Sequence, residues 1–181
     1  MKCPVLYVIA CAAGPASDLG KLVGEAVEDG WEVCVIGTPA AVAGGFIDKA
    51  GLAEMTGRPV RSSWRRSGEE KSNPKADAVV CAPMTMNSAN KLAQGIADTY
   101  ALGLVTEMVG VGVPVVVLPF WSTALDAHPA TRRSVNVLRE WGVRVLYGPG
   151  EWEPHEPGTG GEQLEKYPWS RALRLAAELT R

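Results

Sequence analysis

A short polar segment at the start of a predicted helix carries the side chains best suited to binding chemistry. From Pro83 to Asp98 its sequence is PMTMNSANKLAQGIAD. Thr85 and Ser88 supply hydroxyl groups and Asn87 supplies an amide, next to two flexible apolar methionines. Such a surface suits a flat aromatic ligand with polar edges. The alternative is helix capping by Asn87 or Ser88, worth about 1 kcal/mol, which explains neither Thr85 nor the preceding proline.

A second candidate is the loop Cys11–Ser17, with the sequence CAAGPAS, between the first predicted strand and the first predicted helix. Backbone amides and a serine hydroxyl at such a place can receive a phosphate group. The loop lacks GxGxxG and GK[ST], so it predicts neither a dinucleotide site nor a nucleoside-triphosphate loop. A tight turn without a ligand remains the alternative.

Histidine and cysteine side chains do not predict a metal site. The only histidines, His128 and His155, lack metal-ligand spacing with the cysteines, and no CxxC pair occurs. Free thiols are expected at all four cysteines, which are Cys3, Cys11, Cys34 and Cys81. His128 precedes Pro129, which favours a role at the entry of a helix. The sequence does not place His155, which lies in a segment without periodicity.

The elements that must position these residues are strands that alternate with helices. Near-continuous apolar runs, typical of parallel strands buried on both faces, are Pro4–Ala10, Trp31–Ile36, Asp77–Ala82, Gly112–Leu118 and Val143–Tyr147. Helical periodicity predicts helices after Ser17 or Asp18, over Ser88–Leu104, from Pro129 to Gly142, and over Trp169–Thr180. Pro59–Ser63 is a possible short strand, and Trp64–Pro74 is expected to be a mobile polar loop. The pattern predicts an α/β fold with one doubly wound, Rossmann-like parallel sheet in a single domain, residues 1–181.

Loops rich in Gly, Pro, Ser, Thr or Asn follow the carboxyl ends of four predicted strands. They are Cys11–Ser17, Gly37–Ala41, Pro83–Ser88 and Pro119–Pro129. In doubly wound sheets a ligand binds outside these ends, so the loops are expected to form one site. Residues 148–167 contain too much Gly, Pro and Glu for a helix or a central strand. They are expected to form a C-terminal flap over a ligand or a neighbouring subunit.

Size and charge exclude several classes of protein. The chain has 181 residues, 46% of them hydrophobic, and a formal net charge of −2. It therefore has no general attraction to nucleic acid or to acidic membrane surfaces, and no apolar run is long enough for a membrane span. The start, MKCPVLYVIACAAG, is better explained as a buried first strand than as a secretory signal, so a cytoplasmic protein is expected.

The segment Pro83–Asp98 resembles the PASANT motif and the following helix of the homo-oligomeric flavin-containing cysteine decarboxylases. This family includes phosphopantothenoylcysteine decarboxylases and the peptidyl-cysteine decarboxylases of lantibiotic biosynthesis. Thr85 and Ser88 replace the motif's serine and threonine conservatively. The positions in register are Pro83, Asn87, Lys91, Gly95, Ile96 and Asp98. The wider resemblance covers about residues 4–149.

The resemblance implies FMN in a Rossmann-like fold, at a subunit contact of a homo-oligomer, either a trimer or a dodecamer. By position, it implies that Gly14, Pro15 and Ser17 lie near the phosphate. It places Thr38 near the ribityl chain or the ring. Thr85, Asn87 and Ser88 would contact the isoalloxazine or the substrate, and Asn87 is the expected catalytic residue.

Three departures from the family bear on the chemistry. The family's PxMNxxMW signature, which clamps the substrate carboxylate, is here PFWSTALD, so only Pro119 is retained and Asp126 would repel a carboxylate. No histidine lies between Arg58 and Asp77, where the family's active-site histidine is expected. The flap has no cysteine, a feature that the peptidyl enzymes share.

The predicted function is therefore an FMN-binding oxidoreductase or decarboxylase-like enzyme for a small thiol or a C-terminal cysteine peptide. A non-catalytic flavin-binding subunit or carrier is the alternative. Flavin prenyltransfer ranks last, because the chain lacks a Ser-Gly-rich start and a basic cluster for a prenyl phosphate.

Overall fold

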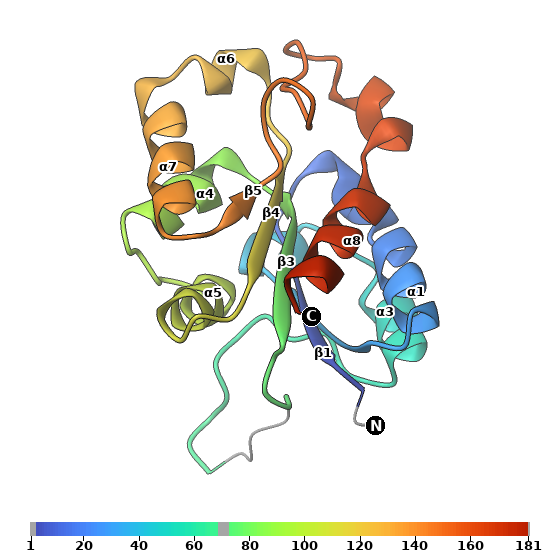
Figure 1. Ribbon diagram of the computed structural model, residues 1–181. Helices are drawn as coiled ribbons and strands as arrows, with labels where there is room; N and C mark the ends of the chain where they lie inside the picture. The colour runs from blue at the N-terminus through green and yellow to red at the C-terminus, as the bar shows by residue number, and fades with distance from the viewer. Residues whose placement is uncertain (1–2, 69–72, 181) are drawn as a thin grey trace.

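The computed structural model describes residues 3–68 and 73–180. Within them, five parallel strands form one sheet with helices on both faces (Figure 1). The strands are β1 (Val5–Ala10), β2 (Glu32–Gly37), β3 (Ala78–Met84), β4 (Val115–Pro119) and β5 (Arg144–Val145). Their order is β2-β1-β3-β4-β5. The predicted doubly wound parallel sheet is confirmed.

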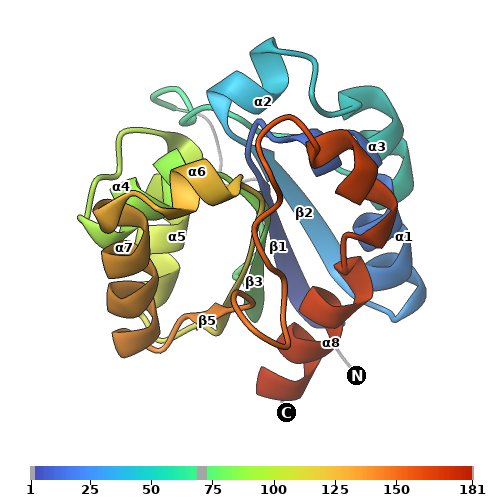
Figure 2. The same ribbon diagram turned by 90° about the horizontal axis from the view of Figure 1, so that it is seen from above.

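The helices divide into two layers, as Figure 2 shows from above. One face of the sheet carries α1 (Gly20–Glu28), α3 (Lys49–Thr56) and α8 (Trp169–Leu179). The other carries α4 (Met86–Ala93), α5 (Tyr100–Gly110) and α7 (Pro129–Glu140). Short helical segments in the connections are η1 (Gly14–Asp18), α2 (Pro39–Ala43), α6 (Thr123–Asp126) and η2 (Gly160–Lys166).

Each face of the sheet packs its own apolar layer, because successive side chains of a strand point to opposite faces. In β1, Leu6 and Val8 pack in the cluster that includes residues of α1 and α8. Tyr7 and Ile9, between and beyond them, pack in the cluster that includes residues of α4, α5 and α7. Every residue of β1 is buried, which explains why its sequence is a continuous apolar run.

Two predicted elements differ in type from the structure, and a third lies partly outside the described residues. The single helix over Ser88–Leu104 is wrong, because the chain forms α4 and α5 with a break at Gly95, whose φ is 71°. The possible strand Pro59–Ser63 is reduced to one isolated bridge between Ile36 and Arg61. The predicted loop Trp64–Pro74 includes residues 69–72, which lie outside the described part of the chain.

The strand order reverses between β1 and β3, since β1 pairs with β2 on one side and with β3 on the other. A crevice forms at such a switch point because the connections on its two sides turn to opposite faces of the sheet. The loops after β1 to β4 meet there, at the upper edge of the sheet in Figure 1.

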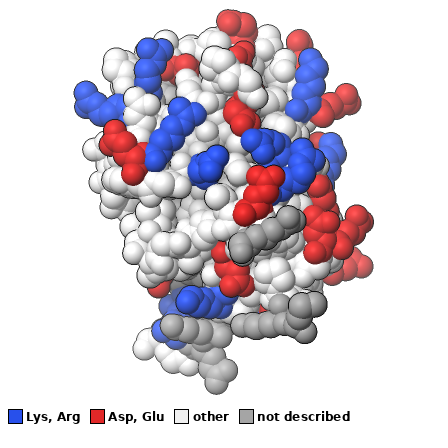
Figure 3. Space-filling view, viewed as in Figure 1, with Lys and Arg blue, Asp and Glu red and all other residues white. Residues whose placement is uncertain are grey.

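On the side of the molecule that Figure 3 shows, basic and acidic side chains are interspersed. No large patch of a single charge is visible on that side. In residues 3–68 and 73–180, no helix combines the length and the apolar character that crossing a bilayer requires.

Candidate functional site

Two adjoining hollows lie at the carboxyl edge of the sheet and share Ala12, Thr85 and Asn87. The first, here called the flap hollow, has a volume of about 560 Å³ and is lined by residues 12–14, 85–87, 120–122, 125, 155, 157 and 158. The second, here called the β2 hollow, has a volume of about 400 Å³ and is lined by residues 11, 12, 38–40, 85, 87, 88, 91, 99 and 102. The linings come from the loops after β1, β2, β3 and β4 and from the flap.

The structure brings most of the predicted site residues to these hollows. Thr85 and Asn87 line both, Gly14 lines the flap hollow, and Thr38 and Ser88 line the β2 hollow.

Pro15 and Ser17 line neither hollow. Pro15 is buried within η1, whereas Ser17 is exposed and its hydroxyl donates to the Gly14 carbonyl at 3.3 Å. Both residues shape the loop after β1. The predicted cap of the first helix by Ser17 or Asp18 is wrong, because both residues lie in η1 and α1 begins at Gly20 without a side-chain cap.

Two threonines fix the starts of the helices that border the β2 hollow. The Thr38 hydroxyl accepts from the Ala41 amide, and the Thr85 hydroxyl accepts from the Ser88 amide, each at 3.3 Å. The alternative explanation, a cap at Asn87 or Ser88, does not hold, because the N-cap of α4 is Thr85. Thr85 satisfies the free amide of the first turn, and the exposed Asn87 side chain lines both hollows.

Backbone hydrogen bonds join the first residue of three loops to the end of the neighbouring strand. The Cys11 amide donates to the Pro83 carbonyl at 3.0 Å and the Thr38 amide donates to the Ala10 carbonyl at 2.9 Å. The Phe120 amide donates to the Met84 carbonyl at 2.9 Å. The loops after the four long strands are thus one connected unit, and the relative positions of the lining side chains are fixed by main-chain contacts.

Cys11 borders the β2 hollow, but its thiol is unsuited to nucleophilic chemistry. Burial raises the pKa of this thiol, and its sulfur lies 3.8 Å from the Met84 sulfur. Since the thiolate is the reactive form, a buried neutral thiol is inert. All four cysteines are free in the structure, as the sequence predicts.

The flap folds over the first hollow through an aromatic cluster around Phe120. Ring centroids of His155 and Tyr167 lie 4.7 and 5.7 Å from that of Phe120, and Trp152 stacks on it at 6.2 Å. The buried Tyr167 hydroxyl also donates to the Leu118 carbonyl at 2.7 Å. The flap is therefore anchored to the end of β4 at several points.

Gly14 has to be small because the flap approaches it closely. A β-carbon at this position would lie 3.1 Å from Leu164 Cδ2 of η2 and 3.4 Å from Phe120 Cε1. The loop after β1, the residue after β4 and the flap thus meet at Gly14.

His155 is a residue that sequence reasoning could not place. The structure brings it into the lining of the flap hollow, beside the segment that contains Asn87. Its carbonyl accepts from the Thr123 amide at 2.8 Å, and its backbone bridges to Ser122. A bridge formed by a Gly/Pro-rich flap has no periodic signal in the sequence.

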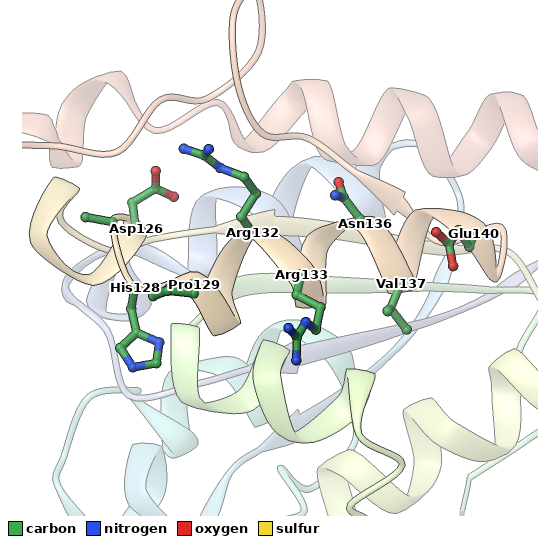
Figure 4. Close-up of a pocket in the computed structure, with 9 residues that line it drawn as sticks. Asp126, His128, Pro129, Arg132, Arg133, Asn136, Val137 and Glu140 are labelled. Carbon is green, nitrogen blue, oxygen red and sulfur yellow. The ribbon is translucent and has the colours of Figure 1, made fainter.

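Asp126 does not lie in either hollow, so the expected repulsion of a carboxylate there has no basis in the geometry. Its Oδ1 accepts from Trp121 Nε1 at 3.1 Å and from the Tyr147 hydroxyl at 2.6 Å. Burial and this carboxylate raise the pKa of Tyr147 to about 12. Asp126 instead borders a separate open groove along α7, shown in Figure 4, where Arg132 and Arg133 point in different directions.

No group of three or more His, Cys, Asp or Glu side chains suitable for a metal ion occurs in the part of the chain that the structure describes.

The strand order and the hollows at the switch point define an α/β protein of flavodoxin-like arrangement with a ligand site at its carboxyl edge. A sequence model of the family described as Flavoprotein matches residues 2–163, and the chain belongs to this family of flavin-binding proteins. The predicted relationship is thereby confirmed.

Solved structures share the fold over nearly the whole chain. One is the FMN-dependent cysteine decarboxylase TvaF from thioviridamide biosynthesis, with 24% identity, a TM-score of 0.70, and coverage of 96% of this chain and 98% of that one. HAL3 from Cryptococcus neoformans has 22% identity, a TM-score of 0.69 and 99% coverage of both chains. The FMN-binding protein AtHal3 has 21% identity, a TM-score of 0.68 and 98% coverage of both. At these identities the likeness shows the fold.

Curated relatives match shorter segments. A cysteine/cysteine sulfinic acid decarboxylase from an unknown prokaryotic organism is 32% identical over 85 residues, which are 47% of this chain and 20% of that protein. The coenzyme A biosynthesis bifunctional protein CoaBC of Bacillus subtilis (strain 168) is 37% identical over 67 residues, 37% of this chain and 16% of that protein. The chain thus matches a fifth or less of the length of these two relatives.

Proposed function

We propose that this chain binds FMN at the carboxyl edge of the sheet and oxidises a small thiol or the C-terminal cysteine of a peptide, with loss of the carboxylate as carbon dioxide. The observation that carries the proposal is the position of Asn87, whose exposed side chain lines both hollows. Family membership and the FMN-dependent relatives support the cofactor.

The residues present fit FMN. Both hollows have volumes within the range of about 300–1,000 Å³ that is usual for ligand sites. Thr38, Thr85 and Ser88, which carry hydroxyl groups, line one hollow, and Met86 and Phe120 line the other. This mixture suits a ligand that has a polar chain and a flat apolar ring.

FMN would be held by the predicted set of residues. Thr38, Thr85, Asn87 and Ser88 would contact it directly, and Gly14, Pro15 and Ser17 would form the loop beside its phosphate. Lys91 lines the β2 hollow, where its ammonium group pairs with Asp98. These contacts with FMN are part of the proposal.

Bound FMN would supply the acceptor for the two electrons and the one hydrogen that leave the carbon next to the sulfur, while the S–H group gives up its hydrogen as a proton. The bond between the substrate's α-carbon and its carboxylate then breaks, and carbon dioxide leaves. Asn87 has two amide hydrogens that can donate to that carboxylate or to the sulfur. Phe120 and the flap residues His155, Pro157 and Gly158 line the flap hollow and would contact a substrate bound there.

Replacing Asn87 tests the proposal. We expect Asn87→Ala to lower turnover of cysteine-terminated peptides by about 100-fold or more, as loss of a positioned group at the reacting atoms does, and to leave FMN bound. Mass spectrometry of the peptides measures the loss of carbon dioxide and two hydrogens, and visible absorption measures bound flavin. The control is Gln94→Ala, because Gln94 is exposed at the end of α4 and lines neither hollow. Normal turnover by Asn87→Ala would contradict the assignment.

A non-catalytic flavin-binding subunit is the second candidate. It is favoured by the segment after β4, where Phe120 and Trp121 pack with the flap and with Asp126 in place of the family's carboxylate clamp. Such a protein would bind FMN and convert none of the cysteine-terminated peptides in the same assay.

We also propose a cytoplasmic homo-oligomer with the site at a subunit contact. Large apolar side chains that remain exposed in the single chain support an assembly: Trp64 is 57% exposed and Val111 is 62% exposed. The four free cysteines support a reducing compartment. A monomer in sedimentation velocity would contradict the assembly, and recovery outside the cytoplasm in cell fractionation would contradict the location.

A further inference from the structure

We propose that His155, on the flap, is the proton acceptor for the substrate thiol, and this role rests on the proposed function. The sequence contains two histidines, His128 and His155, and neither lies between Arg58 and Asp77. His155 and Asn87 line the same hollow although they are far apart in sequence.

The position of His155 is determined by contacts of both its backbone and its ring. The carbonyl of His155 accepts from the Thr123 amide at 2.8 Å, directly after β4. The imidazole lies against Phe120, with 4.7 Å between ring centroids and 40° between ring planes. The residue is half-buried and lines the flap hollow.

The hydrogen bond of the ring determines which nitrogen can accept a proton. Nδ1 lies 2.9 Å from the Glu156 carbonyl oxygen. A carbonyl oxygen only accepts, so Nδ1 carries the hydrogen, and the neutral ring has its lone pair on Nε2. The fixed Nδ1 contact thus leaves Nε2 as the base.

The chemical step is a proton transfer. Nε2 takes the proton of the substrate's S–H group, which leaves a thiolate and an imidazolium, and the Glu156 carbonyl continues to accept from Nδ1. No other bond changes in this step. The thiolate is the form that gives up electrons, and the acceptor is the FMN of the proposed function.

The other histidine does not fit this role. His128 is the N-cap of α7, where its Nδ1 accepts from the Ala130 amide at 3.2 Å. It is exposed and borders the groove along α7 rather than either hollow (Figure 4). His128 therefore serves as a matched control for His155.

Gly160 is a positioning residue for the imidazole. A β-carbon at Gly160 would lie 3.0 Å from His155 Cε1 and 3.2 Å from Nε2, so alanine would displace the ring or cover Nε2. At the neighbouring Gly161, a β-carbon would have no atom within 4 Å. A β-carbon at Gly160 would also lie 3.4 Å from Phe120 Cε1, so Gly160→Ala disturbs the packed rings of His155 and Phe120, whereas Gly161→Ala disturbs neither ring.

The activity test compares these variants as FMN-loaded protein. We expect His155→Gln to lower kcat on a cysteine-terminated peptide by about 100-fold or more, which is the usual contribution of a general base, with FMN affinity unchanged. His128→Asn, which keeps a capping side chain, and Gly161→Ala should behave as wild type, whereas Gly160→Ala should lose kcat. If His155→Gln turns over normally while Asn87→Ala does not, the role of His155 is overturned and the proposed function stands.

A second readout needs no turnover. With two histidines in the chain, NMR of histidine-labelled protein should give two sets of imidazole signals, which His155→Gln and His128→Asn assign. Addition of FMN alone should shift the signals of His155 and leave those of His128 in place. Unshifted His155 signals with FMN bound would overturn the role of His155. Absence of FMN binding, or of any turnover by wild type, would overturn the proposed function and this role with it.

Discussion

Asp126 and Tyr147 show how one substitution in a family signature gives a structural contact. The Asp126 carboxylate accepts from the Tyr147 hydroxyl at 2.6 Å, and burial together with this carboxylate raises the pKa of Tyr147 to about 12. We expect Asp126→Asn to bring that pKa back toward 10.0, the ordinary value for tyrosine, since the amide carries no negative charge beside the phenolate. Titration of tyrosinate absorbance measures this, with Tyr147→Phe as the control that identifies the signal. An unchanged alkaline transition in Asp126→Asn would contradict the contact.

The same contact has a predictable effect on stability. Below about pH 10 the hydroxyl is protonated in both the folded and the unfolded chain, so its contribution is fully present. Between about pH 10 and pH 12 the unfolded chain loses the proton first, which lowers the free energy of unfolding as pH rises. Urea unfolding at these pH values should therefore show a smaller loss of stability in Tyr147→Phe than in wild type.

Some of the candidate site was predictable at the level of single residues. The sequence predicts a site at Thr85, Asn87 and Ser88 because these polar residues follow a buried strand and lie at the start of a helix. The exact capping residue was not predictable, since Thr, Asn and Ser are all good caps and local geometry decides among them. His155 was not predictable either, because its place depends on a flap contact with Thr123 that no periodic pattern encodes.

Gly95 lies where the sequence predicts one continuous helix and the structure forms two, α4 and α5. It lies between α4 and α5 with φ of 71°, in the left-handed region that glycine adopts without strain. We expect Gly95→Ala to lower the free energy of unfolding by about 1–2 kcal/mol, the cost of a β-carbon in this conformation. Gly110, the last residue of α5, lacks a positive φ, and a β-carbon there would have no atom within 4 Å. Gly110→Ala should therefore stabilise the protein by up to about 1 kcal/mol, and equal effects of the two changes in urea unfolding would contradict this account.

The remaining strands and helices show which sequence patterns are sufficient to predict an element. β1 was predicted closely because all its residues are buried and apolar, and α8 because its apolar face is regular. The break between α4 and α5 was missed because apolar residues continue on both sides of Gly95. The possible strand at Pro59–Ser63 has only one bridge, to Ile36, since a short edge segment is decided by tertiary contacts rather than by propensity.

At the scale of the whole molecule, the strand order determines where the chemistry can occur. The reversal between β1 and β3 brings the loop of Gly14 next to the loop of Asn87, and the flap closes one side through Phe120. Sequence alone predicted the parallel sheet and its functional edge. It could not predict how the flap closes, because that depends on aromatic contacts between segments far apart in the chain.

Thermal stability tests whether the whole fold recognises the phosphate of FMN. A ligand that binds only the folded chain stabilises it by about 2.7 kcal/mol at a hundredfold excess over Kd, which for a chain of this size raises Tm by about 5–10 °C. We expect this shift with FMN and a clearly smaller one with riboflavin at the same concentration, because riboflavin has no phosphate for the loop of Gly14, Pro15 and Ser17 to bind. Equal shifts would mean that the phosphate is not held. No shift with either flavin would contradict flavin binding at this edge, and a shift with FMN that Asn87→Ala retains would separate binding from catalysis.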